Sequence, residues 1–554
     1  DDSANVYDRI IENNPEINVQ KIYLDLYKQE STAGGQRYPQ AKQDLRQRVQ
    51  NGALILNFVG HGGPPGWTSE RILNTSVVSE WSNYDKLPVF MTATCQFSRY
   101  DDPGRVSGGE LTFLNPDGGA IAMFTTTRVV FDSQNGRLIT YFYDSVLHRQ
   151  NKIPKDLGRI YMDTKNSYAN LNNDIEFRKF SLLGDPAIRL ALPQHDVELS
   201  HVNDKLITDV DVDTLKALSK ISVKGFVKDQ NGIKLTNFNG VTYVTVFDKI
   251  KTVQNRQNDE KSSLRTFDIQ NNVLFKGKAT VVNGEFESTF VVPKDIDYQY
   301  GKSKFSFYSE NSVQDATGFS DSIVVGGFDE NAPEDNLGPQ IKLFINDSTF
   351  VYGGLSDENP LLIAEIFDEN GINTVGSGIG HDISAIIDND QSNPIILNDF
   401  YESDIDTYKS GKLKYLMSDI EPGLHTLTLK VWDVYNNSSE KTIEFTVVEK
   451  EKMAISHVLN YPNPFTTNTQ FMFEHNQASS FLRVKIEVFT ISGKLVKNIK
   501  RTIKTEGFRA EPITWNGRDD FGDKIARGVY VYKVTVETPS GEKAEKYEKL
   551  VILN

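Results

Sequence analysis

The stretch ALILNFVGHGG (residues 53–63) ends an apolar run on a histidine that lies between glycines. Two further apolar runs follow, LPVFMTATC (residues 87–95) and GGAIAMFTT (residues 118–126), and the first of them ends on the only cysteine of the chain. None of the three runs alternates between polar and apolar residues. Continuous apolar runs are typical of strands buried on both faces, as in a parallel sheet covered by helices. These runs therefore predict an α/β fold.

The segments around these runs predict helices and one more strand. Residues 37–52 place Ala41, Leu45 and Val49 four apart, with a proline near the start and Gly52 just past the end, which indicates a helix. Residues 135–150 predict an amphipathic helix, and QKIYLDLY (residues 20–27) predicts a strand.

After residue 194 the pattern changes to short β-branched and aromatic runs between Gly, Asn and Asp turns, which predicts β-sandwiches. A Pro-, Gly- and acid-rich linker is expected over residues 326–339, and another boundary near residue 450. We predict a multidomain chain: an α/β parallel-sheet subdomain over residues 1–194, followed by three all-β Ig-like sandwich domains over 195–335, 336–450 and 451–554.

Composition narrows the functional classes. The 554 residues are 38% hydrophobic and carry a net charge of −15, which excludes wholesale disorder and argues against nucleic-acid binding. No run of 18 apolar residues occurs, so no membrane-spanning helix is expected. A single cysteine forms no internal disulfide and leaves the compartment open. The first residues, DDSANVYDRIIENN, predict an internal start with an N-terminal part missing or processed.

The histidine and the cysteine suggest a catalytic pair. A thiol acts as a nucleophile when a nearby base takes its proton, and imidazole is the natural base near neutral pH. If the strands that precede His61 and Cys95 are neighbours in a parallel sheet, both side chains emerge at the same edge. Gly62 and Gly63 would let the backbone approach a substrate carbonyl. The alternative is a small buried cysteine and an ordinary Gly-His-Gly turn.

Four segments in chain order resemble the gingipain family of caspase-like cysteine peptidases: NFVGHGG (57–63), FMTATC (90–95), GGAIAMFTTT (118–127) and RKFSLLGDPAIRLAL (178–192). The resemblance implies that His61 is the general base and Cys95 the nucleophile. It implies an oxyanion hole from the amides of Gly62 and Cys95, and an S1 wall from the loop after Phe124. The expected oxyanion or substrate-binding residues are Gly62, Gly63, Thr94, Thr125 and Thr126.

The chain departs from this family in one respect. The first half of such a catalytic domain would precede Asp1, and the acid that orients the histidine is expected there or near Asp1 and Asp2, with Asp25 as a weaker candidate. The resemblance does not place the carboxylate that selects arginine in some relatives, so no P1 preference is assigned.

The tail carries a second resemblance. YPNPF (461–465), ISGKLV (491–496) and the segment 515–534, with Trp515 as an expected core anchor, resemble the C-terminal signal domain of the type IX secretion system of Gram-negative bacteria. An Ig-like spacer or adhesion domain is the alternative. The resemblance implies export to the outer-membrane surface. Because the chain runs through to Asn554 with its tail, we favour the sortase family of that system over a secreted cargo peptidase, which would lose the tail.

The sortase resemblance implies particular partners. These are proteins that bear type IX C-terminal domains, a PorV-type outer-membrane β-barrel that anchors the enzyme, and an amine of lipopolysaccharide as acyl acceptor. No cofactor is expected. Structural calcium is a secondary possibility in the turns YDDPGR (100–105) and FDSQNGR (131–137), which lack EF-hand spacing, and no zinc site is expected. The competing class is a non-catalytic adhesin or scaffold with a degenerate peptidase fold.

Overall fold

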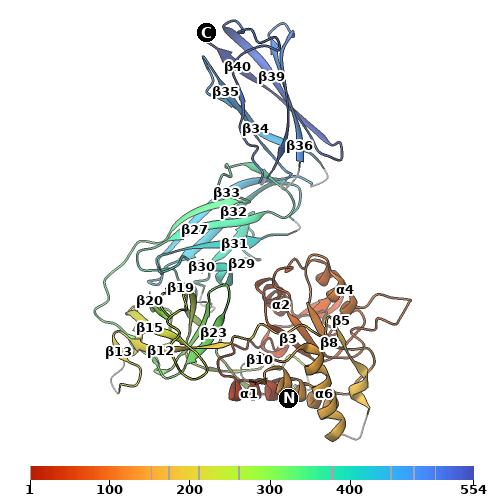
Figure 1. The fold of residues 1–554 in the computed structure, drawn as a ribbon, viewed down its shortest axis with the longest axis vertical. Coiled ribbons are helices and arrows are strands. Elements are labelled where there is room, and N and C mark those ends of the chain that lie inside the picture. Colours follow the sequence, from red (N-terminus) through yellow and green to blue (C-terminus); the bar gives the residue numbers. More distant parts are fainter. Residues whose placement is uncertain are drawn as a thin grey trace. The chain divides into compact units, whose positions relative to one another are not determined.

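The computed structural model describes residues 2–150, 153–171, 175–209, 213–259, 262–375, 380–418, 420–449, 452–477, 481–505 and 507–553 (Figure 1). The chain folds into two compact units. Unit 1 comprises residues 1–216, 220–289 and 296–328, and unit 2 comprises residues 217–219, 290–295 and 329–554. Unit 1 contains the three apolar runs, so it contains the candidate site.

A four-stranded sheet forms the centre of the α/β part of unit 1, in the order β11-β8-β7-β3. The three predicted strands are present as β3 (Ile55–Val59), β7 (Val89–Ala93) and β8 (Ala122–Thr126), all parallel, and β11 (Phe180–Leu183) adds an antiparallel edge. Every residue of β7 and β8 is buried, as the continuous apolar runs predict.

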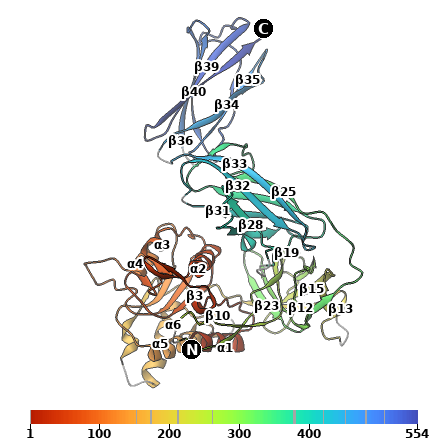
Figure 2. The ribbon, with the colours of Figure 1, turned by 180° about the vertical axis from the view of Figure 1, so that it is seen from behind.

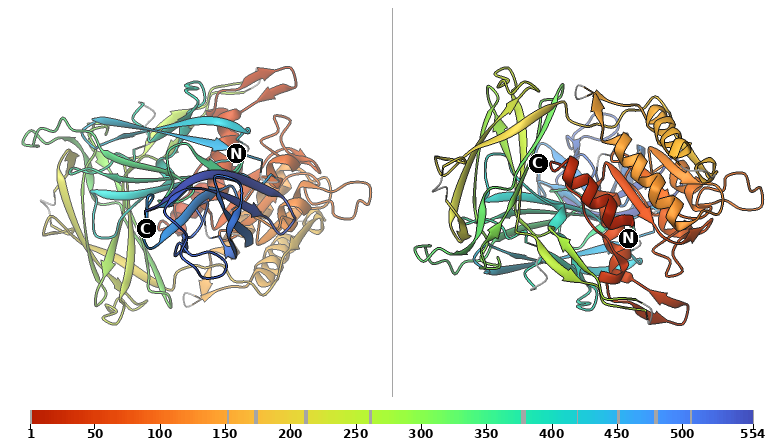
Figure 3. Two further views of the ribbon diagram at one scale, coloured as in Figure 1. Left: turned by 90° about the horizontal axis from the view of Figure 1, so that it is seen from above. Right: turned by 90° about the horizontal axis from the view of Figure 1, so that it is seen from below.

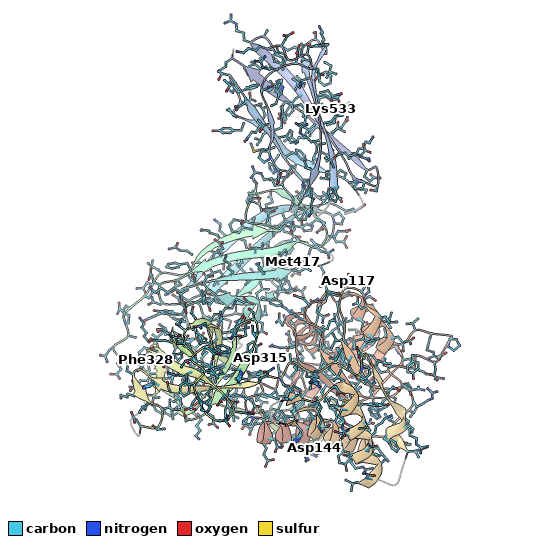
Figure 4. All side chains as sticks on the ribbon, in the orientation of Figure 1. Asp117, Asp144, Asp315, Phe328, Met417 and Lys533 are labelled. Atoms are coloured by element: carbon cyan, nitrogen blue, oxygen red, sulfur yellow. The ribbon has the colours of Figure 1, made fainter. Side chains whose placement is uncertain are left out.

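Helices cover both faces of this sheet. The elements are α1 (Asp2–Asn13), α2 (Pro39–Asn51), α3 (Thr75–Ser79), α4 (Gly108–Leu114), α5 (Asp132–Val146) and α6 (Leu157–Leu171). Figure 1 shows β3 and β8 between α2 and α4 on one side and α1 and α6 on the other, and the view from below in Figure 3 shows α1 alongside the α5–α6 pair. Asp144 on α5, labelled in Figure 4, accepts a hydrogen bond of 2.8 Å from Arg9 on α1.

Each face of the sheet has its own hydrophobic core because successive side chains point to opposite faces. Met91 and Phe124 pack on the α1–α5–α6 side, and Phe90 and Met123 pack on the α2–α3 side with Trp67. The predicted helix over 37–52 is confirmed as α2, which buries Ala41, Leu45 and Val49 and ends at Gly52. The helix predicted over 135–150 is α5, which begins at Asp132, three residues earlier.

The prediction of a strand over residues 20–27 is wrong. The segment contains only a 3₁₀ turn, η1 (Leu24–Leu26), because a loop of the following β-domain takes its hydrogen-bonding groups. Arg256 donates its backbone N–H to the carbonyl of Asp25 and its side chain to the carbonyl of Leu26. The ring of Tyr23 lies edge-on against Phe267.

The rest of unit 1 is dominated by an eight-stranded sheet in the order β19-β16-β22-β23-β12-β15-β20, with β13 (Lys205–Leu206) paired to β12. Its other strands are β12 (His195–Val202), β15 (Lys220–Lys228), β16 (Gly240–Phe247), β19 (Val273–Val281), β20 (Glu285–Val291), β22 (Lys304–Glu310) and β23 (Asp315–Ser320). One large sheet is not the two matched sheets expected of an Ig-like domain, so that label stays a prediction here.

Unit 2 contains two successive pairs of sheets, most of whose strands are labelled in Figures 1 and 2. The first pair has the orders β25-β27-β31-β30 and β26-β33-β32-β28-β29, and the second has β34-β35-β38 and β37-β36-β39-β40. The first pair comprises β25 (Gln340–Ile345), β26 (Gly354–Ser356), β27 (Leu361–Phe367), β28 (Ser384–Ile387), β29 (Ile395–Ile396), β30 (Tyr401–Ser403), β31 (Ser410–Leu416), β32 (Gly423–Trp432) and β33 (Ser438–Val447). The second comprises β34 (Ile455–Tyr461), β35 (Thr469–His475), β36 (Phe481–Thr490), β37 (Leu495–Lys504), β38 (Ile513–Trp515), β39 (Gly528–Glu537) and β40 (Lys543–Ile552).

Each pair of sheets encloses its own hydrophobic core. Trp515 is 3% exposed and packs against Phe465 and Phe471 inside the second pair. The sheets fall inside the predicted ranges 336–450 and 451–554, while the domain boundaries themselves stay predictions.

Candidate active site

His61 and Cys95 occupy equivalent positions beyond two adjacent parallel strands. β3 pairs with β7 so that Val59 lies opposite Ala93, and each of the two candidate residues follows its strand by two positions. The backbone N–H of Gly60 donates to the carbonyl of Ala93, at 3.4 Å, which carries the pairing one step further. The sheet register therefore brings the imidazole and the thiol to the same edge, as the sequence predicts.

The His61 loop is held by a small three-stranded sheet of β4 (Gly62–Gly63), β5 (Gly66–Trp67) and β6 (Leu73–Asn74). The N–H of Thr68 donates to the carbonyl of His61 at 2.9 Å. The Trp67 ring is 2% exposed and stacks on Phe58 of β3, with ring centroids 4.2 Å apart. This packing fixes the loop on the sheet and leaves the His61 side chain exposed.

Gly62 allows the His61 loop to approach the Cys95 loop closely. A Cβ at this position would lie 2.5 Å from Thr94 Oγ1 and 2.9 Å from the carbonyl oxygen of Gly66. Both distances are shorter than any ordinary van der Waals contact. At Gly63 the nearest atom to a Cβ would be Pro65 Cδ, at 3.6 Å, which is an ordinary contact. Of the two glycines, the structure therefore requires only Gly62 for steric reasons.

The Cys95 thiol is partly buried beneath the loop that follows β8. Its Sγ donates a hydrogen bond to the carbonyl of Val130 at 3.5 Å. Within the described residues no hydrogen bond joins Cys95 to His61, and the N–H of Cys95 has no backbone acceptor.

The residue after the cysteine has an unusual backbone conformation. Gln96 has φ of 53°, the left-handed region that non-glycine residues rarely adopt, and its N–H donates to the carbonyl of Arg128 at 3.2 Å. The chain turns sharply there, so the Cys95 loop lies against the loop after β8.

Thr94, Thr125 and Thr126 are buried, with exposed fractions of 1%, 0% and 0%. The hydroxyl of Thr126 donates to the carbonyl of Thr94, and the hydroxyl of Thr125 bonds at 2.8 Å both to Thr92 and to Ser98. Their side chains thus join the end of β8 to β7 and to the loop that follows β7. Contact between these three residues and a substrate stays a prediction.

None of the described residues supplies the acid that is expected to orient His61. Within those residues no carboxylate hydrogen-bonds to His61. The carboxylate of Asp25 accepts instead from Asn258 N–H, Ser262 Oγ and Asn255 Nδ2, at 3.0, 2.7 and 2.5 Å. Partial burial by itself would raise the pKa of Asp25, but these hydrogen bonds outweigh it and lower the pKa. Asp25 therefore holds two segments of unit 1 together. Asp1 and the side chain of Asp2 lie outside the described residues.

Two features of the site were not predicted from the sequence. Gly109 at the start of α4 packs against Ser98, because a Cβ there would lie 1.8 Å from Ser98 Oγ. Arg128 forms a bidentate ion pair with Asp101, which links the loops after β8 and β7 at the surface. Ser107 and Glu110 form a capping box at the start of α4. In the sequence this motif indicates where the helix begins, but it does not indicate that the helix contacts the Cys95 loop.

One of the two turns considered for calcium, residues 100–105, has basic partners. Asp101 pairs with Arg128, and Asp102 lies 3.0 Å from Arg105 and 3.6 Å from Arg99. Arginine side chains therefore occupy the carboxylates of the turn at residues 100–105, and a calcium ion there stays an untested expectation.

A thiol and an imidazole beyond adjacent strands of a helix-covered parallel sheet, with glycines beside the histidine, define a cysteine-peptidase type of site. Residues 1–191 match the sequence model of peptidase family C25. The similarity to peptidase family C25 thus covers the α/β part of the chain.

Two solved structures illustrate the similarity. Dimeric latent PorU from Porphyromonas gingivalis is 31% identical over 79% of this chain and 41% of that chain, with a TM-score of 0.32. The complex of Porphyromonas gingivalis RgpB pro- and mature domains is 13% identical over 50% of this chain and 57% of that chain, with a TM-score of 0.26. The chain thus spans about two fifths of the PorU chain. No curated protein matches it. Among the described residues, no helix is long and apolar enough to cross a membrane.

Proposed function

We propose that this protein is a cell-surface cysteine endopeptidase and transpeptidase that removes C-terminal signal domains from proteins exported by the type IX system, as a PorU-type sortase. The observation that supports the catalytic part is the pairing of Val59 with Ala93, because His61 and Cys95 each follow these paired residues by two positions. What supports the sortase form is the presence, in one chain, of a family C25 domain and a C-terminal β-domain whose sequence resembles the type IX signal.

The proposed reaction is acyl transfer. His61 takes the proton of the Cys95 thiol, and the sulfur attacks the carbonyl carbon of the scissile peptide bond. The oxyanion of the tetrahedral intermediate accepts hydrogen bonds from the N–H groups of Gly62 and Cys95. His61 then gives its proton to the leaving amine, the C–N bond breaks, and the cut-off tail departs. A thioester remains on Cys95.

The thioester is resolved by water, which gives hydrolysis, or by an amine of surface lipopolysaccharide, which gives transpeptidation. In either case His61 accepts a proton from the attacking group and returns it to the sulfur. The proposed location is the outer-membrane surface, with a PorV-type β-barrel as anchor.

The thiol must change partner before this reaction. In the present arrangement it donates to the Val130 carbonyl, so rotation of the Cys95 side chain toward His61 is the first step. The loop after β8, which carries Val130, thus controls the nucleophile.

The catalytic proposal is tested by labelling with a peptidyl electrophile. Cys95 is the only cysteine, so thiol labelling reports this site alone. We expect stoichiometric labelling of the wild type, none of Cys95→Ala, and at least a ~100-fold slower reaction of His61→Ala. His148→Ala is the matched control, because His148 is an exposed histidine of the same α/β domain. Equal rates for His61→Ala and His148→Ala would contradict the role of His61.

The sortase proposal is tested in the bacterium. A strain that carries Cys95→Ala is expected to release exported proteins that retain their C-terminal domains and therefore migrate as larger species than in the wild type. If their tails are still removed, the sortase function is wrong, even where the labelling experiment supports a peptidase.

A further inference from the structure

Three carboxylates from separate segments of unit 2 meet at one end of the first β-sandwich. Asp335 belongs to the segment that precedes β25, Asp368 directly follows β27, and Asp433 directly follows β32. One oxygen from each lies within 4.8 Å of the other two. β27 and β32, labelled in Figure 1, belong to different sheets of the sandwich, so the cluster joins both sheets to the preceding segment.

Within the part of the chain that the structure describes, none of the three forms an ion pair. Asp433 is 0% exposed and Asp368 is 6% exposed. Burying carboxylates side by side without a cation is strongly unfavourable. Accordingly, burial together with the neighbouring carboxylates raises the pKa of Asp433 to about 6 and raises the pKa of Asp368.

The hydrogen bonds around Asp368 leave one of its oxygens unused. Oδ1 accepts from the N–H groups of Asn370 and Gly371, at 2.8 and 3.1 Å. Within the described residues Oδ2 accepts from no donor. An acceptor in this position is available to a ligand.

Two buried hydroxyls at the same end of the sheet also lack partners. Tyr401 and Ser403 of β30 are 3% and 5% exposed, and neither hydroxyl has a hydrogen bond within the described residues. Buried hydroxyls without a partner are rare in proteins and indicate a missing water or ion.

The sheet register places these hydroxyls toward Asp368. Ser403 pairs with Gly411 of β31, Gly411 pairs with Ile366 of β27, and Asp368 follows Ile366 by two residues on the same face. The Tyr401 hydroxyl reaches over Gly411, because a Cβ on that glycine would lie 2.5 Å from it. Burial and the charge of Asp404 are the larger causes that raise the pKa of Tyr401, and the charge of Asp368 raises it further. The two hydroxyls therefore face the acid cluster.

From this arrangement we infer that Asp335, Asp368 and Asp433 bind a calcium ion. Calcium prefers oxygen ligands at about 2.3–2.6 Å, so two ligand oxygens on one ion lie no more than about 5 Å apart, as these do. Each of the three carboxylates offers one oxygen at this spacing. Waters would complete the shell of the ion and would give the buried hydroxyls of Tyr401 and Ser403 their partners. Because Asp335 lies outside the sheets, the ion would fix the segment that enters the sandwich.

The test is calcium binding by the full chain after treatment with EDTA, and it does not depend on the peptidase proposal. We expect CaCl₂ to raise the melting midpoint of unit 2 by about 5 °C or more at a hundredfold excess over Kd. TbCl₃ is expected to bind with luminescence sensitised by nearby tyrosines, and excess CaCl₂ to displace it. Failure of either experiment on the wild type would overturn the inference.

Asp368→Asn is the informative variant, because its Oδ1 keeps both backbone hydrogen bonds and its new NH₂ group would donate to the neighbouring carboxylates. We expect it to melt no lower than the wild type in EDTA and to lose the calcium response. Asp390→Asn changes an exposed acid of the same sandwich and is expected to keep that response. If both variants respond to calcium like the wild type, the carboxylates share a proton instead of an ion and the inference is wrong.

Discussion

Replacing Gly62 by alanine is expected to damage the site, whereas the same change at the adjacent Gly63 is expected to be tolerated. A methyl group at residue 62 would lie 2.5 Å from Thr94 Oγ1 and 2.9 Å from the Gly66 carbonyl oxygen, about 1 Å and 0.6 Å inside a comfortable contact. The Gly66 oxygen belongs to the backbone of β5, so the His61 loop itself must move. At Gly63 the nearest atom would be 3.6 Å away.

The magnitude follows from overpacking. Forcing a methyl group into a filled space costs about 1–3 kcal/mol of stability. A shift of about 1 Å in the His61 loop is expected to slow labelling of Cys95 about 100-fold. Gly63→Ala is expected to change stability by less than about 0.5 kcal/mol and to leave labelling within a factor of about three. Urea denaturation and labelling by the peptidyl electrophile measure the two effects on the same samples.

A second substitution examines the steric reason itself. Thr94 Oγ1 is buried and has no hydrogen-bond partner within the described residues, so Thr94→Ala removes the closest obstacle without breaking a hydrogen bond. In that background Gly62→Ala is expected to cost less, with a coupling of about 0.5–2 kcal/mol. The Gly66 contact remains, so recovery is partial. Equal effects of alanine at residues 62 and 63, or no coupling with Thr94, would refute the reasoning.

Two further predictions concern buried polar groups. Thr125→Val leaves the hydroxyls of Thr92 and Ser98 without their shared partner, so we expect a loss of about 1–3 kcal/mol and slower labelling of Cys95, both restored by Thr125→Ser. If Thr125→Ala restored stability and labelling as fully as Thr125→Ser, the hydroxyl of Thr125 would have no such role. In the tail domain, burial lowers the pKa of His475 to about 4, below the ordinary value of 6.5. The unfolded chain therefore binds this proton first, so stability is complete above pH 6.5 and falls by up to about 3 kcal/mol as the pH drops toward 4. His475→Asn, which can still accept from Gln477 N–H, is expected to flatten this part of the pH profile in urea denaturation, and an unchanged slope would show that other groups cause it.

The sequence by itself determined the central strands and the candidate pair. β3, β7 and β8 were predictable because a strand buried on both faces needs a continuous apolar run, and α2 because its apolar spacing and end signals agree. His61 and Cys95 stood out because each follows such a run. The local pattern of residues 20–27 predicts a strand, because it says nothing about residues 255–258, which take the hydrogen bonds of this segment.

Only the tertiary structure decided which polar groups meet. The thiol's hydrogen bond to Val130, the link from Thr125 to Ser98, and the meeting of Asp335, Asp368 and Asp433 join residues that are 27 to 98 positions apart. The physical reason is that strand order, register and loop packing set these distances, and no local spacing in the sequence encodes them. Local patterns specify where strands end, and the assembled sheets specify which of those ends become neighbours.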